Sequence, residues 1–209
     1  MSGVVVCFAT AAEGDGLPES IAGRPLARLR TGVGPVNAAI ALTKYLLQTR
    51  ADAVLVCGVG GSYPGSGLNV GDVVCAESET YGDLGAETPA GFLDMKSLGF
   101  PVLEENPPVF NRLPLDLFPA SRRAAFVTCS TCTGTWERAE ALAARTGGAV
   151  ESMEGAALVH AARRMGIRIG EVRGISNAVG DRDRSRWRIA EAAAAARVAV
   201  LAFVEAGGC

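Results

Sequence analysis

The chain has 209 residues, of which 49% are hydrophobic and 20% are charged, and this is enough for one domain with a full core. Its formal net charge of −2 leaves no excess of cations to attract a polyanion, so the composition argues against nucleic-acid binding. An aromatic content of 6% together with 26 glycines favours an α/β protein over a β-sandwich.

Apolar, β-branched runs alternate along the chain with helical patterns. Strands are predicted at 4–10, 51–61, 71–79, 124–129 and 166–176, and helices at 35–50, 135–145, from Gly155 to a stop at Gly166, and 186–206. This alternation predicts one α/β domain over residues 1–209. We expect a central twisted sheet, mostly parallel or mixed, that is covered by helices on both faces.

Two features bear on the location of the protein. The first ten residues, MSGVVVCFAT, contain no basic leader, and the apolar run at 189–204 is interrupted by Glu191 and Arg197. We interpret this run as an amphipathic or core helix rather than a membrane span. The sequence therefore predicts a cytoplasmic protein that does not contact a membrane.

Without an export signal, the six cysteines are expected to be free thiols in the core. They are Cys7, Cys57, Cys75, Cys129, Cys132 and Cys209. The CSTC pair at 129–132 lacks two further ligands for zinc, since His160 is the one histidine. We expect no metal, and we interpret CSTC as the small-residue lining of a pocket.

Three segments at element ends are rich in glycine or small polar residues: TGVGP at 31–35, CGVGGSYPGSG at 57–67 and RGISNAVGDRD at 173–183. The two glycine clusters do not have the GxGxxG spacing, so no dinucleotide cofactor is expected. The GVGG stretch predicts close approach of the backbone to a small ligand, because glycines leave their N–H groups unobstructed. SYPGSG is interpreted as tight turns only.

Two carboxylates, Glu151 and Glu154, stand three residues apart at the start of a predicted helix. Both could simply complement the positive end of the helix dipole. Met153 argues for more than this, because a large soft side chain beside an acid suits a pocket that packs on a sugar and binds its hydroxyls.

At this point the sequence resembles the superfamily of nucleoside phosphorylases and nucleosidases. The motifs that carry the resemblance occur in the expected order: ATAAEGD around Glu13, TGVGPVNAA at 31–39, CGVGG at 57–61 with GLNVGDVV at 67–74, VESMEGAA at 150–157 and VRGISNAVGD at 172–181. Within the superfamily the pattern is most similar to the futalosine hydrolases, given YGDLG at 81–85 and Trp187. The resemblance implies a nucleoside phosphorylase-like fold and hydrolysis of the N-glycosidic bond of futalosine in menaquinone biosynthesis.

The resemblance also implies roles for particular residues. Glu13 matches the acid that activates water, with an exposed loop glutamate as the alternative. Glu154 matches the acid that binds the ribose hydroxyls, and Met153 matches the methionine packed on the sugar. The remaining matched positions are expected near the water and the base: Val59, Gly60, Cys132, Thr133 and Ser176. Glu151 does not match the family spacing, so we keep the helix-dipole interpretation for it.

Asn177 departs from the adenine-specific pattern, which has an aspartate after the serine. An amide can donate to a 6-oxo oxygen and accept from a protonated N7, but it cannot act as a proton acid. Asn177 therefore predicts a catalytic-site contact with hypoxanthine, although Asp181 or Asp183 could supply an acid instead.

Other functions remain open from the sequence. A purine nucleoside phosphorylase would need arginines for phosphate, for which Arg24, Arg28 and Arg30 are candidates. A methylthioadenosine-type nucleosidase and a non-catalytic nucleoside-binding module are further alternatives. The resemblance implies a homodimer or a higher homo-oligomer.

Residues 80–120 have little periodicity, and a loop of that length is usually functional. We expect it to cover the carboxyphenyl tail of futalosine through Phe92, Phe100 or Phe110, within one chain or across a dimer interface.

Overall fold

The computed structural model describes residues 3–21 and 23–208. The central sheet has eight strands: β1 (Gly3–Phe8), β4 (Ala27–Arg30), β5 (Ala51–Ser62), β6 (Val73–Tyr81), β9 (Arg112–Pro114), β10 (Arg123–Thr128), β11 (Val150–Ser152) and β12 (Arg168–Ala178). Two small hairpins lie outside this sheet: β2 (Ser20–Ile21) with β3 (Arg24–Pro25), and β7 (Gly85–Thr88) with β8 (Gly91–Asp94).

The sheet is mixed, as predicted. Its strand order is β11-β10-β6-β12-β5-β1-β4, and β9 pairs with β6. The pairs β1–β4, β1–β5, β5–β12, β6–β10 and β10–β11 are parallel, whereas β6–β12, β6–β9 and β5–β11 are antiparallel. Because β11 pairs with both β10 and β5, five of the strands close into a ring, and this closure was not predicted.

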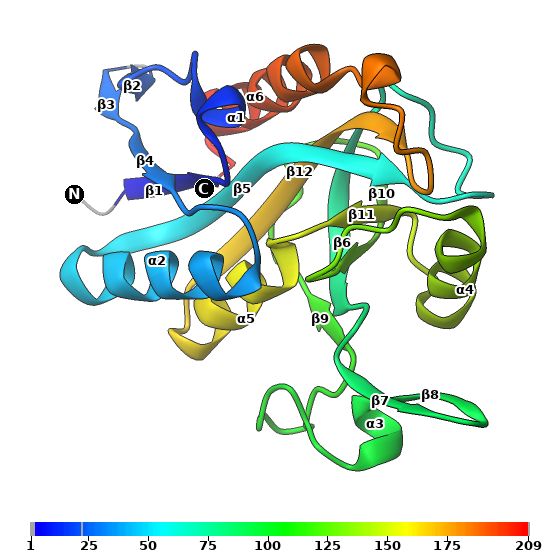
Figure 1. The fold of residues 1–209 in the computed structure, drawn as a ribbon. Coiled ribbons are helices and arrows are strands. Elements are labelled where there is room, and N and C mark those ends of the chain that lie inside the picture. Colours follow the sequence, from blue (N-terminus) through cyan, green and yellow to red (C-terminus); the bar gives the residue numbers. More distant parts are fainter. Residues whose placement is uncertain (1–2, 22, 209) are drawn as a thin grey trace.

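Helices cover both faces of the sheet (Figure 1). On one face, α2 (Pro35–Gln48) and α5 (Gly155–Arg164) bury Leu42 and Leu158 in the larger core cluster. On the other, α6 (Ile189–Glu205) buries Ala196 and Val200 against β5 and β12. Further helices are α1 (Ala11–Gly14), α3 (Met95–Leu98) and α4 (Trp136–Thr146), with a short 3-10 helix, η1 (Arg184–Arg186), before α6.

Local sequence explains where α2 begins. Gly34 precedes it with a φ of 93°, a conformation that favours glycine, and Pro35 occupies the first turn, where no backbone N–H is needed. The helix therefore starts directly after the TGVG turn, and this turn leaves the Gly34 N–H free to bind a side chain from elsewhere.

The segment 80–120 is more ordered than the sequence suggested. It contains the β7–β8 hairpin, α3 and β9, and its leucines Leu103, Leu113, Leu115 and Leu117 are buried in the core clusters. The hairpin and α3 project from the body of the molecule (Figure 1). The expectation of an irregular loop is wrong, because the first half of the segment forms a hairpin and a short helix and these leucines anchor its second half in the core.

Among the helices that the structure describes, none combines the length and the apolar character that a membrane crossing requires.

Candidate active site

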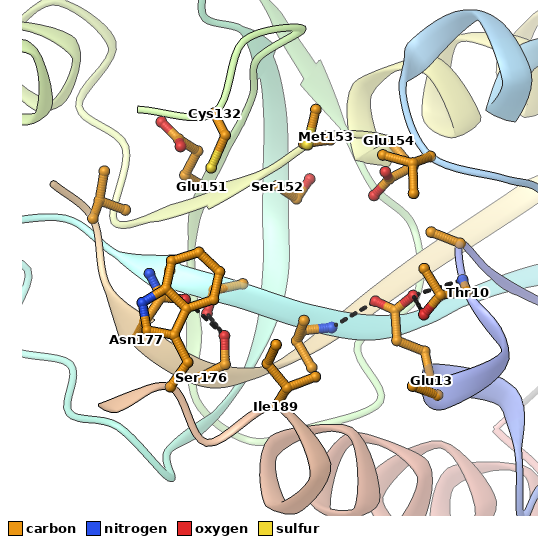
Figure 2. A pocket seen from close by; sticks show the side chains of 18 of the residues that line it. Thr10, Glu13, Cys132, Glu151, Ser152, Met153, Glu154, Ser176, Asn177 and Ile189 are labelled. Carbon is orange, nitrogen blue, oxygen red and sulfur yellow. Dashed lines mark hydrogen bonds between the residues drawn. The ribbon is translucent and has the colours of Figure 1, made fainter. Parts of the chain in front are cut away.

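One cavity of about 410 Å³ is lined by residues of β5 and β12 and by the junctions of β1 with α1 and of β11 with α5. All nine residues that the sequence suggested for a site line this cavity: Glu13, Val59, Gly60, Cys132, Thr133, Met153, Glu154, Ser176 and Asn177. In Figure 2, Met153 and Glu154 lie on one side of the cavity, and Glu13 and Asn177 lie on the other side, well apart from each other.

Glu13 is held by hydrogen bonds from two elements. Its Oε2 accepts from the backbone N–H of Thr10 (2.9 Å) and from the Thr10 hydroxyl (3.0 Å), and its Oε1 accepts from the N–H of Val59 (3.0 Å). The residue is 4% exposed, so the alternative of an exposed loop glutamate is wrong. The Thr-x-x-Glu spacing at the start of α1 fixes the carboxylate at the cavity wall.

Glu154 stands at the N-cap of α5 and is 5% exposed. Its Oε1 accepts from the N–H of Gly34 (3.0 Å), which joins the α5 junction to the turn before α2. Burial raises the pKa of Glu154, and the charge of Arg173 and the Gly34 N–H offset only part of this effect. Met153 precedes it at the same junction and lines the cavity beside it.

Glu151 does not complement a helix dipole, because it lies in β11 and not in the helix. It is buried and accepts hydrogen bonds from the Tyr63 hydroxyl (2.7 Å), the Thr133 N–H (2.9 Å) and the Thr133 hydroxyl. Tyr63 comes from SYPGSG, so this segment does more than turn. Together these contacts fix the loop after β10 against the cavity.

Arg173 is the residue that the sequence reasoning missed. It is 2% exposed on β12, and its Nη1 donates to the Val59 carbonyl (3.2 Å). Its Nη1 lies 3.8 Å from Glu13 Oε1, and its Nη2 lies 3.7 Å from Glu154 Oε2. Burial alone would lower its pKa, but the surrounding carboxylates raise it overall. The sequence did contain a signal for this residue. Glu171 and Arg173 stand at alternate positions of an apolar strand, which places both side chains on one face.

Asn177 and Ser176 end β12 at the cavity. The Asn177 Oδ1 accepts from the Ser176 hydroxyl (2.8 Å), and its Nδ2 donates to the Ala178 carbonyl (3.0 Å). These bonds leave one N–H and one lone pair of the amide without a protein partner in the described residues. The amide can therefore offer both a donor and an acceptor to a ligand.

The cysteines divide into two groups. Cys7, Cys57, Cys75 and Cys129 are buried free thiols, as expected, whereas Cys132 is exposed and its Sγ contacts Arg182 Nη1 at 3.0 Å. The prediction of a core thiol is wrong for Cys132, because this residue lies in the loop after β10 and lines the cavity. Cys209 lies outside the described residues. Within residues 3–21 and 23–208, no group of three His, Cys, Asp or Glu side chains could hold a metal ion.

Two of the arginines considered for phosphate, Arg28 and Arg30, are not part of the cavity lining. Arg28 donates to the Leu17 carbonyl (3.0 Å) and pairs with Glu19 (3.4 Å), and Arg30 is exposed on β4. The side chain of Arg24 lies outside what the structure describes. Phe92, Phe100 and Phe110 do not line the cavity of their own chain either.

The sequence profile of the phosphorylase superfamily matches residues 19–206. The chain is 38% identical to the futalosine hydrolase of Thermus thermophilus over 190 residues, covering 86% of this chain and 82% of that relative. It is 42% identical to the futalosine hydrolase of Streptomyces coelicolor over 178 residues, covering 82% and 75%. Among solved structures, the 5'-methylthioadenosine/S-adenosylhomocysteine nucleosidase of Neisseria meningitidis has a TM-score of 0.80 at 18% identity, covering 99% of this chain and 100% of that one. At this identity the structural likeness concerns the fold alone.

Proposed function

The chain belongs to the futalosine hydrolase family within the phosphorylase superfamily, and from that premise we propose that it hydrolyses the N-glycosidic bond of futalosine. The products are hypoxanthine and dehypoxanthine futalosine, and the reaction belongs to menaquinone biosynthesis. The single observation that carries the proposal is that Glu13, Glu154 and Asn177 share one cavity with Met153.

In this proposal Glu13 is the general base. Its carboxylate takes a proton from water while the water oxygen bonds to the anomeric carbon of the ribose. The bond from that carbon to N9 breaks, and hypoxanthine departs with the electron pair and takes a proton from solvent at the purine ring. Glu154 accepts hydrogen bonds from the ribose hydroxyls, and Met153 packs on the sugar.

The base is bound at the other end of the cavity. The free N–H of Asn177 donates to the 6-oxo oxygen, and its carbonyl accepts from the protonated N7. Ser176 holds the amide in this orientation. The backbones at Cys132 and Thr133 contact the purine, and those at Val59 and Gly60 lie beside the water and the base.

Hydrolysis is favoured over phosphorolysis by the charges around the cavity. Two buried carboxylates, Glu13 and Glu154, would repel phosphate under the sugar, and the one buried arginine between them already faces both. Arg28 binds the Leu17 carbonyl instead, and Arg30 is exposed on β4. Residues 1–209 then form a single nucleosidase domain that needs no cofactor.

The protein is proposed to act in the cytoplasm as a homodimer or a higher homo-oligomer. Support comes from exposed apolar side chains on α2 (Val36, Ile40 and Leu47) and on the 80–120 segment (Leu84, Leu93 and Phe100). Since that segment does not line its own cavity, any contact with the futalosine tail would come from a second copy. Sedimentation equilibrium tests this, and a monomer at micromolar concentration would contradict it.

The decisive experiment is incubation with futalosine and with inosine, each with and without phosphate. Hypoxanthine should be released from futalosine at the same rate in both buffers, and a phosphorylated sugar product would overturn the hydrolase assignment. Glu13→Gln should lower kcat roughly 10²- to 10⁴-fold while futalosine still binds. A wild-type protein that binds nucleoside without turnover would instead be a binding module.

A further inference from the structure

A second pair of carboxyl groups lies behind the cavity and does not line it. Glu79 of β6 and Glu171 of β12 are both 0% exposed, on neighbouring antiparallel strands. The Thr128 hydroxyl donates to Glu79 Oε2 (2.9 Å), and Arg173 Nε donates to Glu171 Oε1 (2.7 Å). The remaining oxygens, Glu79 Oε1 and Glu171 Oε2, have no hydrogen-bond partner among the described residues.

These two unpartnered oxygens lie next to each other. A Cβ atom at Gly155 would overlap with Glu79 Oε1, and it would stand 2.6 Å from Glu171 Oε2. Glycine at the start of α5 therefore leaves the space that the two carboxyl groups fill together. Two ionised carboxylates this close in a buried site cannot both keep their charge, whereas one O–H···O⁻ bond satisfies both oxygens.

The charges in this region lead to the same conclusion. Four buried carboxyl groups, those of Glu13, Glu79, Glu154 and Glu171, surround one buried cation, Arg173. If all four were ionised, three negative charges would be left without a cation, and two of the ionised carboxylates, Glu79 and Glu171, would be fully buried, which is costly.

We propose that Glu79 is protonated at neutral pH and donates from Oε1 to Oε2 of Glu171, and that this singly charged pair positions Arg173 between Glu13 and Glu154. The effect of this pair on futalosine turnover rests on the proposed function. Glu79 and Glu171 are positioning residues, since neither reaches the cavity.

The surroundings of Glu79 support this assignment. Burial and the neighbouring Glu171 charge raise the pKa of Glu79, and Arg173 and the Thr128 hydroxyl offset part of that effect. Tyr81, on the same strand, is another titratable group nearby, and burial raises its pKa, so it stays neutral. On the far side of Arg173 from Glu171, the charged groups that face the guanidinium are Glu13 and Glu154.

The pair has a mechanical effect on Arg173. With Nε bound to Glu171, the two terminal nitrogens stay 3.8 and 3.7 Å from Glu13 and Glu154, which is too far for direct hydrogen bonds. Without the Glu171 charge, the guanidinium would move toward Glu13 and make that carboxylate a weaker base. Glu171 thus keeps the arginine close enough to attract the two acids without neutralising them.

The test compares two amide variants. Glu79→Gln copies the protonated acid, since its NH2 can donate to Glu171 and its carbonyl can accept from Thr128, so kcat on futalosine should stay within about threefold and its pH profile should not move. Glu171→Gln moves the negative charge away from Arg173, so kcat should fall roughly tenfold and the acid limb of the profile should shift to lower pH. Equal losses in both variants, or an unmoved profile in Glu171→Gln, would overturn the proposal.

A spectroscopic measurement needs no substrate and no turnover. Infrared spectroscopy of the wild-type protein at about pH 8 should show the C=O stretching band of a protonated carboxyl group, and this band should vanish in Glu79→Gln. A wild-type spectrum without the band would refute the shared proton even if futalosine is hydrolysed. A present band with no hydrolysis would leave the pair intact and refute the proposed function instead.

Discussion

Asn177 shows how one amide can select a base. Its Oδ1 is already bound to the Ser176 hydroxyl and its Nδ2 to the Ala178 carbonyl, so its orientation is fixed before a ligand arrives. The remaining N–H and lone pair match a 6-oxo purine protonated at N7. A 6-amino purine would place two donors against them and leave one buried group wrongly paired.

The substitution Asn177→Asp should therefore change base preference. We expect the ratio of kcat/KM for the 6-amino analogue over futalosine to rise roughly 10- to 100-fold, because an aspartic acid can donate to N7 and accept from the amino group. Measuring hypoxanthine and adenine release from the two nucleosides gives the ratio. Asn69→Asp is the matched control, since Asn69 is exposed and away from the cavity. An unchanged ratio in Asn177→Asp would remove Asn177 from base recognition.

At the scale of single elements, β5 brings the backbone and two charged side chains together. Gly58 lies in the middle of this strand, and a Cβ atom there would stand 2.5 Å from both Arg173 Nη1 and Glu13 Oε1. The glycine is thus required by close approach of side chains, and not by its φ angle. This close approach explains the first glycine of GVGG, a stretch for which the sequence had suggested only contact with a ligand.

Gly58→Ala should consequently displace Glu13 and Arg173. We expect the free energy of unfolding to fall by about 1–3 kcal/mol, as for other overpacked sites, and kcat to fall with it. Urea unfolding and futalosine turnover measure the two effects. Gly3→Ala in β1 provides the control, because a Cβ at Gly3 meets no atom within 4 Å. If both variants unfold at the same urea concentration, Gly58 does not hold this packing.

The elements that the sequence predicted well are those with long apolar runs. β5, β12 and α2 were predicted because each has more than ten residues, which is long enough for its pattern of apolar residues to be recognised in the sequence. β11 has three residues, too few to show a period of two, so no strand was predicted there. Glu151 was therefore interpreted through the dipole of the helix predicted from Gly155. The motifs predicted nine residues that line one cavity, and their roles stay a prediction. Arg173 was missed because its alternation with Glu171 indicates only a shared strand face, and nothing local connects it with Glu13 or Glu154.

At the scale of the whole molecule, closure of the sheet brings the acids together. Pairing of β11 with both β10 and β5 sets Glu151 and the start of α5 across from the ends of β5 and β12. Glu13, Glu154 and Glu171 come from three different parts of the chain and meet at Arg173, and Glu79 approaches Glu171 from a fourth part. Because no single strand pair predicts this meeting, it depends on long-range pairings that are invisible to local patterns.

This cluster should make the stability of the fold depend on pH. If Glu79 keeps its proton when folded and loses it when unfolded above a pKa of about 4.3, the folded state binds one more proton. The free energy of unfolding then falls as pH rises, and Glu79 contributes about 1.4 kcal/mol per pH unit to this fall. The fall begins near the pKa of Glu79 in the unfolded chain and ends near its raised pKa in the folded protein. The raised pKa of Glu154 acts in the same direction.

Glu79→Gln should remove the contribution of Glu79 and leave that of Glu154. Urea unfolding at several values between about pH 5 and pH 8 should give a shallower decline than in the wild type, so that the variant gains relative stability as pH rises. Glu105→Gln is the control: Arg163 lowers the pKa of Glu105 through a hydrogen bond, so its stabilisation is lost only as pH falls below this range. Parallel curves for wild type and Glu79→Gln would mean that Glu79 is ionised in the folded protein, and the buried arginine would then have to balance all four carboxylates.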